Sequence, residues 1–215
     1  ISEVHYNPSD PSPTEIQLGF DSHNDFEFVE LLNTSDRTIV LAGAHFAQAD
    51  VGDGEEGIEF EFAQGAIQSL APGERLLVVE DRAAFEARYG TGLPIAGEWA
   101  GTLNDNNELL TVLGYDGSTI VQFRYDDSGD WPSRADGLGS SLELAEGSSQ
   151  FNDAASWFAS VPLGGTPGAA PVAPIGVVIN EVLSHTDPPL VDSIELYNPT
   201  TQVINVSGWY LSDAN

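Results

Sequence analysis

The chain has 215 residues, with 34 Asp or Glu against 6 Lys or Arg, and its formal net charge is −28. This charge argues against binding to nucleic acid phosphates, where cationic side chains supply most of the affinity, and against an anionic membrane surface. Cys is absent, which excludes disulfides and thiol chemistry, and no apolar stretch is long enough to predict membrane insertion.

Alternating apolar and polar residues predict β-strands along most of the chain. The first clear alternating segments are residues 26–32 and 57–62. In the segment 57–62, alternation places Ile58, Phe60 and Phe62 on one face and acidic residues on the other. Another strand is expected at residues 75–79, directly after a Pro-Gly turn.

A single helix is expected at residues 81–89. Asp81 supplies an acidic N-cap and Gly90 a C-terminal stop. Phe85 and Tyr89 lie four residues apart, so both side chains should face the sheet.

The next strands, residues 108–113 and 119–125, flank Asp116-Gly117, a strong β-hairpin signal. A further alternating run covers residues 138–145. Many short strands with one short helix are typical of an all-β fold, and we predict an antiparallel β-sandwich.

The chain also repeats itself. Three blocks near the N-terminus recur near the C-terminus. Residues 1–4 (I-S-E-V) match residues 179–182 (I-N-E-V), and residues 29–33 (V-E-L-L-N) match residues 194–198 (I-E-L-Y-N). Residues 43–50 align with residues 208–215. Such a long period indicates tandem domains. We therefore predict a domain at 1–163, a Pro/Gly-rich linker at 164–176 and the N-terminal part of a second domain at 177–215, within a larger multidomain protein.

The repeated blocks resemble the lamin tail domain of bacterial extracellular proteins. The motifs, in order, are I-S-E-V-H-Y-N-P (1–8), E-F-V-E-L-L-N (27–33), L-A-P-G-E (70–74), A-D-G-L-G-S-S-L-E-L (135–144), G-T-P-G (165–168) and, in the second copy, G-W-Y-L-S-D (208–213). The first copy departs from the last motif, with Ala44 in place of the Trp. The resemblance implies an immunoglobulin-like β-sandwich and a non-catalytic module of secreted or surface proteins.

Glu3 and Glu30 are the first candidate site, because they recur as Glu181 and Glu195. Alternation places Val29 on the core face and Glu30 on the opposite face. With few Arg and no Lys in the chain, the pair has no obvious cationic partner, so we hypothesise that it helps to bind Ca²⁺, which prefers oxygen ligands. The alternative is a solvated face, or hydrogen bonds to backbone amides.

A second candidate Ca²⁺ site is the Gly-rich acidic loop that carries Asp50, Asp53 and Glu55. Its spacing does not match an EF-hand, and the alternative is a hydrophilic hairpin tip. The acidic turn at residues 126–130 has the same two interpretations.

Catalytic motifs are lacking in the sequence. The four His residues have no zinc-binding spacing. Trp99, Trp131 and Trp157 could form a sugar-binding platform, but aromatic residues of a sandwich usually fill its core.

We expect a non-enzymatic structural or adhesive module of a bacterial extracellular or cell-surface protein, steadied by Ca²⁺ and contacting other domains of its parent chain or neighbouring chains. The alternative is an accessory module that binds a carbohydrate or a protein for an attached enzyme. A hydrolase with paired carboxylates is the third hypothesis.

Overall fold

A computed structural model describes residues 1–52, 54–172, 176–184, 191–198, 203–207, 209 and 211. The chain divides into two compact units, Ile1–Val172 and Ala173–Asn215. Within the residues that the structure describes, no helix has the length and apolarity needed to cross a membrane.

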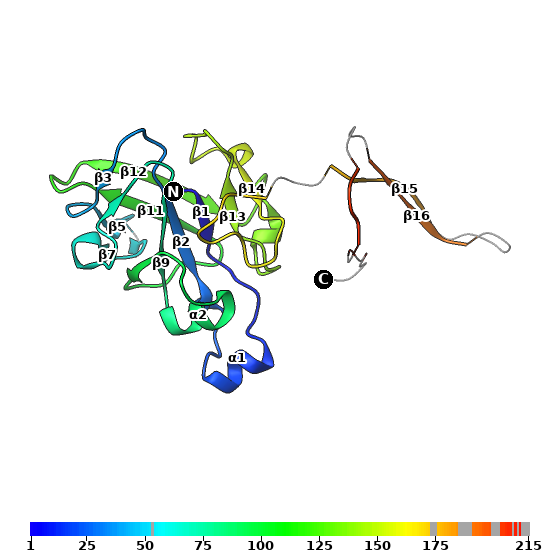
Figure 1. Cartoon of the computed structure of the whole chain (residues 1–215), viewed down its shortest axis with the longest axis horizontal. Helices are drawn as coiled ribbons and strands as arrows, with labels where there is room; N and C mark the ends of the chain where they lie inside the picture. The colour runs from blue at the N-terminus through cyan, green and yellow to red at the C-terminus, as the bar shows by residue number, and fades with distance from the viewer. Residues whose placement is uncertain are drawn as a thin grey trace. The chain divides into compact units, whose positions relative to one another are not determined.

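The first unit is built on two β-sheets (Figure 1). The six-stranded sheet consists, in spatial order, of β10 (Ile95–Glu98), β9 (Arg75–Val79), β2 (Phe28–Leu32), β1 (Glu3–His5), β13 (Leu142–Leu144) and β14 (Trp157–Ala159). The four-stranded sheet consists of β12 (Thr119–Asp126), β11 (Asn107–Leu113), β4 (His45–Phe46) and β7 (Phe60–Glu61). Neighbouring strands are antiparallel except for β9 and β10, which run parallel.

Short elements complete the unit. Two small ribbons pair β3 (Ile39–Val40) with β8 (Ser69–Leu70) and β5 (Ala49–Asp50) with β6 (Glu55–Glu56). Four 3₁₀ turns lie at η1 (His23–Phe26), η2 (Phe62–Gln64), η3 (Ser133–Ala135) and η4 (Ala154–Ser156).

One hydrophobic core joins the two sheets. Val29 and Val78 from the six-stranded sheet belong to the same buried cluster as Leu110 and Phe123 from the four-stranded sheet. Side chains that alternate inward from two sheets into a shared core define a β-sandwich. The predicted all-β sandwich is confirmed.

The predicted helix is also confirmed, as α2 (Arg82–Tyr89). Asp81 accepts a hydrogen bond from the amide of Ala84. Phe85 and Tyr89 meet Phe28 of β2 edge-on, with ring centroids 5.6 and 5.7 Å apart. The helix therefore covers part of the outer face of the six-stranded sheet, where burial of an aromatic side chain contributes roughly 1.5–3 kcal/mol.

A second helix, α1 (Pro13–Leu18), was not predicted from the sequence. Ser12 and Glu15 form a reciprocal capping box, with Pro13 at the first helical position. Gly19 ends the helix in the left-handed conformation, at a φ of 102°. Arg88 of α2 donates to both carboxylate oxygens of Glu15, which fixes α1 beside α2.

The hairpin at Asp116-Gly117 is confirmed, and Gly117 has a φ of 76°. The strand expected at residues 57–62 is shorter in the structure, because the chain turns into η2 at Phe62. Ile58, Phe60 and Phe62 are nevertheless all buried, as their alternation predicted.

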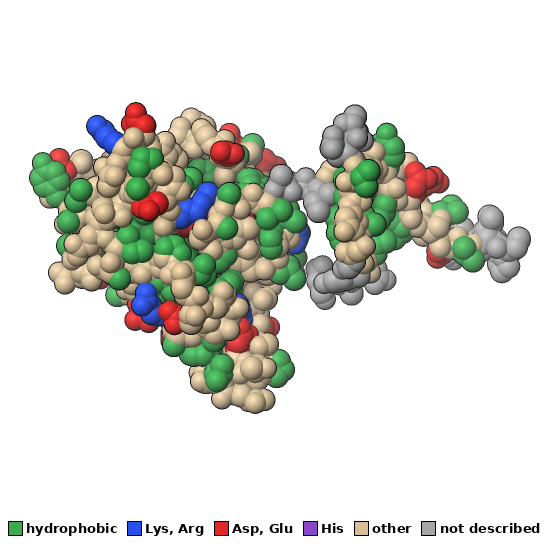
Figure 2. All heavy atoms as spheres, in the orientation of Figure 1, with side chains coloured by type: hydrophobic (Ala, Val, Ile, Leu, Met, Phe, Trp, Pro, Cys, Tyr) green, Lys and Arg blue, Asp and Glu red, His purple; other side chains and the backbone are tan. Residues whose placement is uncertain are grey.

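The second unit contains β15 (Val178–Leu183) and β16 (Ser193–Tyr197), which form an antiparallel pair. Both strands are exposed along their whole length. Apolar side chains such as Val182, Ile194 and Tyr197 consequently lie on the surface of this unit. Figure 2 shows hydrophobic side chains in green on its visible face.

Candidate functional site: a buried row of carboxylates

Three glutamates form a row across the six-stranded sheet. Glu3 of β1 lies opposite Glu30 of β2 on one side and opposite Glu143 of β13 on the other. Their sequence neighbours Val29 and Leu142 point into the sandwich core, so the glutamates occupy the outer face, as alternation requires. All three are almost completely buried, with at most 1% of each residue exposed. We call these three residues the carboxylate row.

Glu30 is the member of the row that has a cationic partner. Ser2 Oγ and the amide of Gly168 donate to its two oxygens, both at 2.7 Å. The guanidinium of Arg75 forms an ion pair with the same carboxylate. The prediction that this glutamate lacks a cationic partner is therefore wrong, because Arg75 on the neighbouring strand β9 reaches it.

Glu3 and Glu143 are held by hydroxyl and amide donors. Ser141 Oγ and the amide of Thr166 donate to Glu3 Oε1, at 2.5 and 2.9 Å. Thr166 Oγ1 donates to Glu143 Oε1 at 2.5 Å. The Oε2 atoms of both glutamates are buried without a hydrogen-bond partner among the described residues, so a protonated, uncharged carboxyl is the form that burial favours here.

Residues 164–168 cover the carboxylate row, and we call them the covering segment. Gly165 lies so close to the row that an added Cβ would stand 2.0 Å from Glu3 Oε1 and 2.7 Å from Ser141 Oγ. At the two ends of the segment, Gly164 lies against Tyr89 and Gly168 against Leu93 and Pro94. Only glycine fits at Gly165, which also has a positive φ of 83°.

The covering segment changes the predicted domain boundary. Residues 164–176 were expected to form a linker, yet the first compact unit extends to Val172. The reason is that Thr166 and Gly168 use their backbone amides to satisfy buried carboxylates. The start of the expected linker is thus part of the domain.

The electrostatics of the row follow from its burial. Removal from water raises the pKa of Glu3 to about 8, against the opposing effect of the donors Ser141 and Thr166. Burial also raises the pKa values of Glu30 and Glu143. At Glu30, the hydrogen bond from Ser2 and the charge of Arg75 oppose this rise. The three carboxyls are direct cross-strand neighbours, so they cannot all be ionised without strong repulsion.

The row does not fit a Ca²⁺ site. Ca²⁺ takes six to eight oxygen ligands, whereas most oxygens of the row already accept hydrogen bonds and Arg75 supplies the positive charge. In the described part of the chain, no group of three or more His, Cys, Asp or Glu side chains is arranged to hold a metal ion.

The acidic loop expected to bind Ca²⁺ is the tip of the β5–β6 ribbon. Asp50 and Glu55 face each other across the ribbon, and Asp50 Oδ1 accepts a hydrogen bond from the amide of Gly52. Asp53 lies outside the described residues. Among the described residues, this loop and the Glu3–Glu30 pair are not brought into one metal-binding group.

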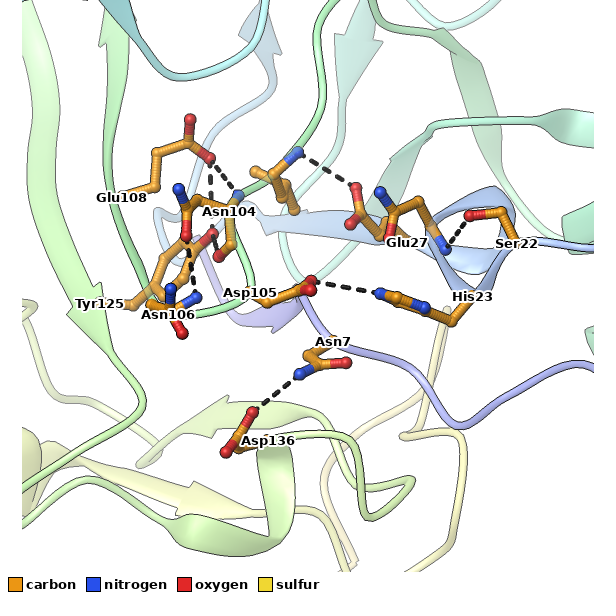
Figure 3. Close-up of polar contacts among 12 residues, drawn as sticks. Asn7, Ser22, His23, Glu27, Asn104, Asp105, Asn106, Glu108, Tyr125 and Asp136 are labelled. Carbon is orange, nitrogen blue, oxygen red and sulfur yellow. Dashed lines mark hydrogen bonds and ion pairs between the residues drawn. The ribbon is translucent and has the colours of Figure 1, made fainter.

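A second polar cluster surrounds the turn before β11 (Figure 3). Glu108 Oε2 accepts from the amide of Asn104 at 2.9 Å, and Tyr125 Oη donates to the carbonyl of Asn104 at 2.7 Å. Glu27 accepts from the amide of Leu103, and burial raises the pKa of Glu27 to about 10. Each of these contacts ends on a backbone group of the turn, so the cluster fixes the turn in place.

Two further contacts in Figure 3 join distant segments at the same turn region. His23 of η1 lies 3.3 Å from Asp105, and Asn7 Nδ2 donates to Asp136 at 2.7 Å. Neither contact was predicted, because its partners are far apart in sequence.

The aromatic and histidine candidates take structural positions. Trp99 and Trp157 are buried in the core, and Trp131 packs against it, so they form no exposed sugar platform. His5 is buried beside Tyr89 Oη, and its pKa is lowered to about 3 by desolvation and, less strongly, by Arg88.

The Glu pair recurs in the second unit in the same register. Glu181 of β15 lies opposite Glu195 of β16, as Glu3 lies opposite Glu30. Asn180 Nδ2 donates to Glu195 Oε1 at 2.6 Å, where the first unit has the bond from Ser2 to Glu30 at 2.7 Å. In both units, the residue before the first glutamate thus donates to the second glutamate.

Comparison with known proteins adds no relative: no family model matches the chain, and no curated protein or solved structure matches it significantly.

Proposed function

We propose that this chain is a non-catalytic structural or adhesive module of a larger secreted or cell-surface bacterial protein, similar to the lamin tail domain. Its partners in this proposal are other domains of the parent chain or neighbouring chains. The observation that carries the proposal is the repeated glutamate pair, which has the same register in both units and in both accepts a side-chain hydrogen bond from the residue before the first glutamate.

The surroundings of the pair support a structural role. A carboxylate that acts on a substrate must be within hydrogen-bond reach of it. Glu3 and Glu30 are instead enclosed between the sheet and the covering segment, and their donors are protein groups. Together with the Arg75–Glu30 ion pair, these bonds connect β1, β2, β9, the residue before β13 and the covering segment, so the pair holds the outer face of the sheet together.

The composition supports an extracellular setting. A net charge of −28 without Lys or Cys favours a soluble protein in a salty or Ca²⁺-containing medium. The repetition of the domain within one chain is typical of tandem arrays.

The first test separates a structural pair from a catalytic pair. Glu3→Gln and Glu30→Gln should change the melting temperature, and neither wild type nor variants should hydrolyse a panel of glycosides and polysaccharides. Turnover that both substitutions abolish, while circular dichroism shows folded protein, would establish a hydrolase and refute the proposal.

The second test concerns location. An antibody against the first unit should label intact cells of the source organism as strongly as permeabilised cells. Labelling that requires permeabilisation would contradict a secreted or surface-exposed module.

A further inference from the structure

Strand β12 is the longest strand that lies at a sheet edge in the first unit. It has eight residues and pairs with β11 on one side only. The edge strands β7 and β14 have only two and three residues, and β10 has an irregularity between Ile95 and Gly97. Proteins usually protect long edges with Pro, charge or bulges. β12 (T-I-V-Q-F-R-Y-D) contains no Pro, but it carries Arg124 and Asp126 near its end and an irregularity at Ile120. The unprotected part of this edge is therefore the stretch around Gln122.

The hydrogen-bonding pattern shows which backbone groups of β12 face outward. Leu109 of β11 directs its amide to Glu56, and Thr111 directs its carbonyl to Ala47, so both point away from β12. Their partners in register are Arg124 and Gln122. In an antiparallel pair, residues opposite one another either both bond across the pair or both face away, so the backbone groups of Arg124 and Gln122 face the open edge.

One of these outward groups is already occupied by a side chain. Asn152 Oδ1 accepts a hydrogen bond from the amide of Arg124 at 3.0 Å. The Asn152 amide oxygen thus takes the place that a backbone carbonyl of a further strand would take. The N–H and C=O of Gln122 have no backbone partner in the described part of the chain.

A groove runs along this part of the edge. Its walls are residues 120–122 of β12 and the facing segment 149–153, and its volume is about 540 Å³. Ile120 is 62% exposed, whereas Phe151 packs on the core residue Phe123. The groove is lined mostly by polar residues and has apolar surface at Ile120 and Phe151, beside the unpaired backbone groups of Gln122. In strand addition, such backbone groups supply affinity and the pockets for alternate side chains supply specificity.

We propose that the groove beside β12 binds an extended, positively charged peptide segment, which pairs with the edge at Gln122 as an additional β-strand. A positive charge is expected for the bound segment because its surroundings are acidic. Asp153 is the charged residue of the groove wall, and the formal net charge of the whole chain is −28. A second copy of the chain would meet strong like-charge repulsion, whereas a Lys- or Arg-bearing segment is attracted. This inference is independent of the proposed function, because it depends on β12 and not on the carboxylate row.

Alternation also defines what the segment should look like. Residues at every second position would face the apolar side of the groove, and the intervening residues would face solvent. Apolar β-branched residues therefore suit the first set, and basic residues suit the ends of the segment.

The test uses the whole chain and a blocked peptide of sequence K-V-T-V-T-V-K, with calorimetry to measure the dissociation constant. A peptide of equal charge, K-V-T-P-T-V-K, is the control for the peptide. The Pro peptide should bind at least about tenfold more weakly, the effect of losing about one net hydrogen bond.

Two protein variants form a matched pair. Gln122→Pro removes the outward amide and should weaken binding by about tenfold. Gln122→Thr keeps this amide and should bind the peptide like wild type. On wild-type protein, amide hydrogen exchange at Gln122 should slow when the peptide is added, and this measurement decides the matter even if Gln122→Pro does not fold.

Three results would overturn the proposal. Equal binding of both peptides would mean that charge alone attracts them. Unchanged exchange at Gln122 would place the peptide elsewhere. Self-association of the free protein that Gln122→Pro abolishes would make a second copy the occupant of the edge.

Discussion

Replacing Gly165 by Ala should destabilise the first unit, because this glycine is the closest backbone contact of the carboxylate row. The new Cβ would stand 2.0 Å from Glu3 Oε1, so this oxygen must move away from its donors Ser141 and Thr166. Loss of buried hydrogen bonds costs roughly 1–3 kcal/mol, and a side chain at positive φ costs roughly 1–2 kcal/mol. We therefore expect the free energy of unfolding to fall by about 2–5 kcal/mol.

Gly147→Ala is the matched control. Gly147 has a similar φ of 77°, and an added Cβ there meets no atom within 4 Å. This variant should lose only the backbone contribution, about 1 kcal/mol. Urea unfolding followed by tryptophan fluorescence measures both variants. An equal fall in the free energy of unfolding for the two variants would show that the backbone at Gly165 is not in close contact with Glu3.

Three further predictions concern charge. The pKa of Glu3 is about 8 in the folded state against 4.5 in the unfolded chain, so stability from this group is full below pH 4.5 and is lost as pH rises from 4.5 to 8. Urea unfolding at high salt across this range should show the decline, and Glu3→Gln should flatten it. Arg75→Met leaves Glu30 buried without its cation, so in the same assay the free energy of unfolding should fall by about 3–5 kcal/mol. The control is Arg37→Met, at an exposed residue, which should lower the free energy of unfolding by less than about 0.5 kcal/mol. EDTA should leave the melting temperature unchanged, since four of the six oxygens of the row accept hydrogen bonds from protein donors and Arg75 supplies the positive charge; a lower value that Ca²⁺ restores would contradict this reasoning.

Patterns within short stretches of the sequence correctly predicted strand faces and helix ends. Alternation around Val29 and Glu30 gave the correct faces of β2, and Asp81 and Gly90 gave the correct ends of α2. The helix α1 had a readable signal as well. Ser12, Pro13 and Glu15 carry the capping box and the N-terminal Pro, but the helix has only six residues and exposes Ile16, so no amphipathic pattern marks it.

The carboxylate row was only partly predictable. The repeat singled out Glu3 and Glu30, and the structure makes them direct neighbours. Glu143 and Arg75 join them through strand pairing between segments far apart in sequence, which a local pattern does not encode. The alternation of apolar Leu142 and acidic Glu143 was the pattern in the sequence that could have placed Glu143 on the outer face of the sheet.

The covering segment illustrates a different difficulty. Its Gly and Pro content is typical of linkers, yet Gly165 is required because the backbone passes directly over Glu3. A glycine that permits close approach and a glycine that permits flexibility look the same in a sequence. Only the buried acceptors beneath the segment distinguish the two.

Amide hydrogen exchange at Thr166 and Gly168 tests the central claim most directly, namely that the covering segment closes over a buried structural row. Their amides donate to Glu3 and Glu30, so both should exchange as slowly as the amides of β1 and β2, through unfolding of the whole unit. If both exchange as fast as the amide of the open turn residue Gly147, the segment is a linker and the account is wrong.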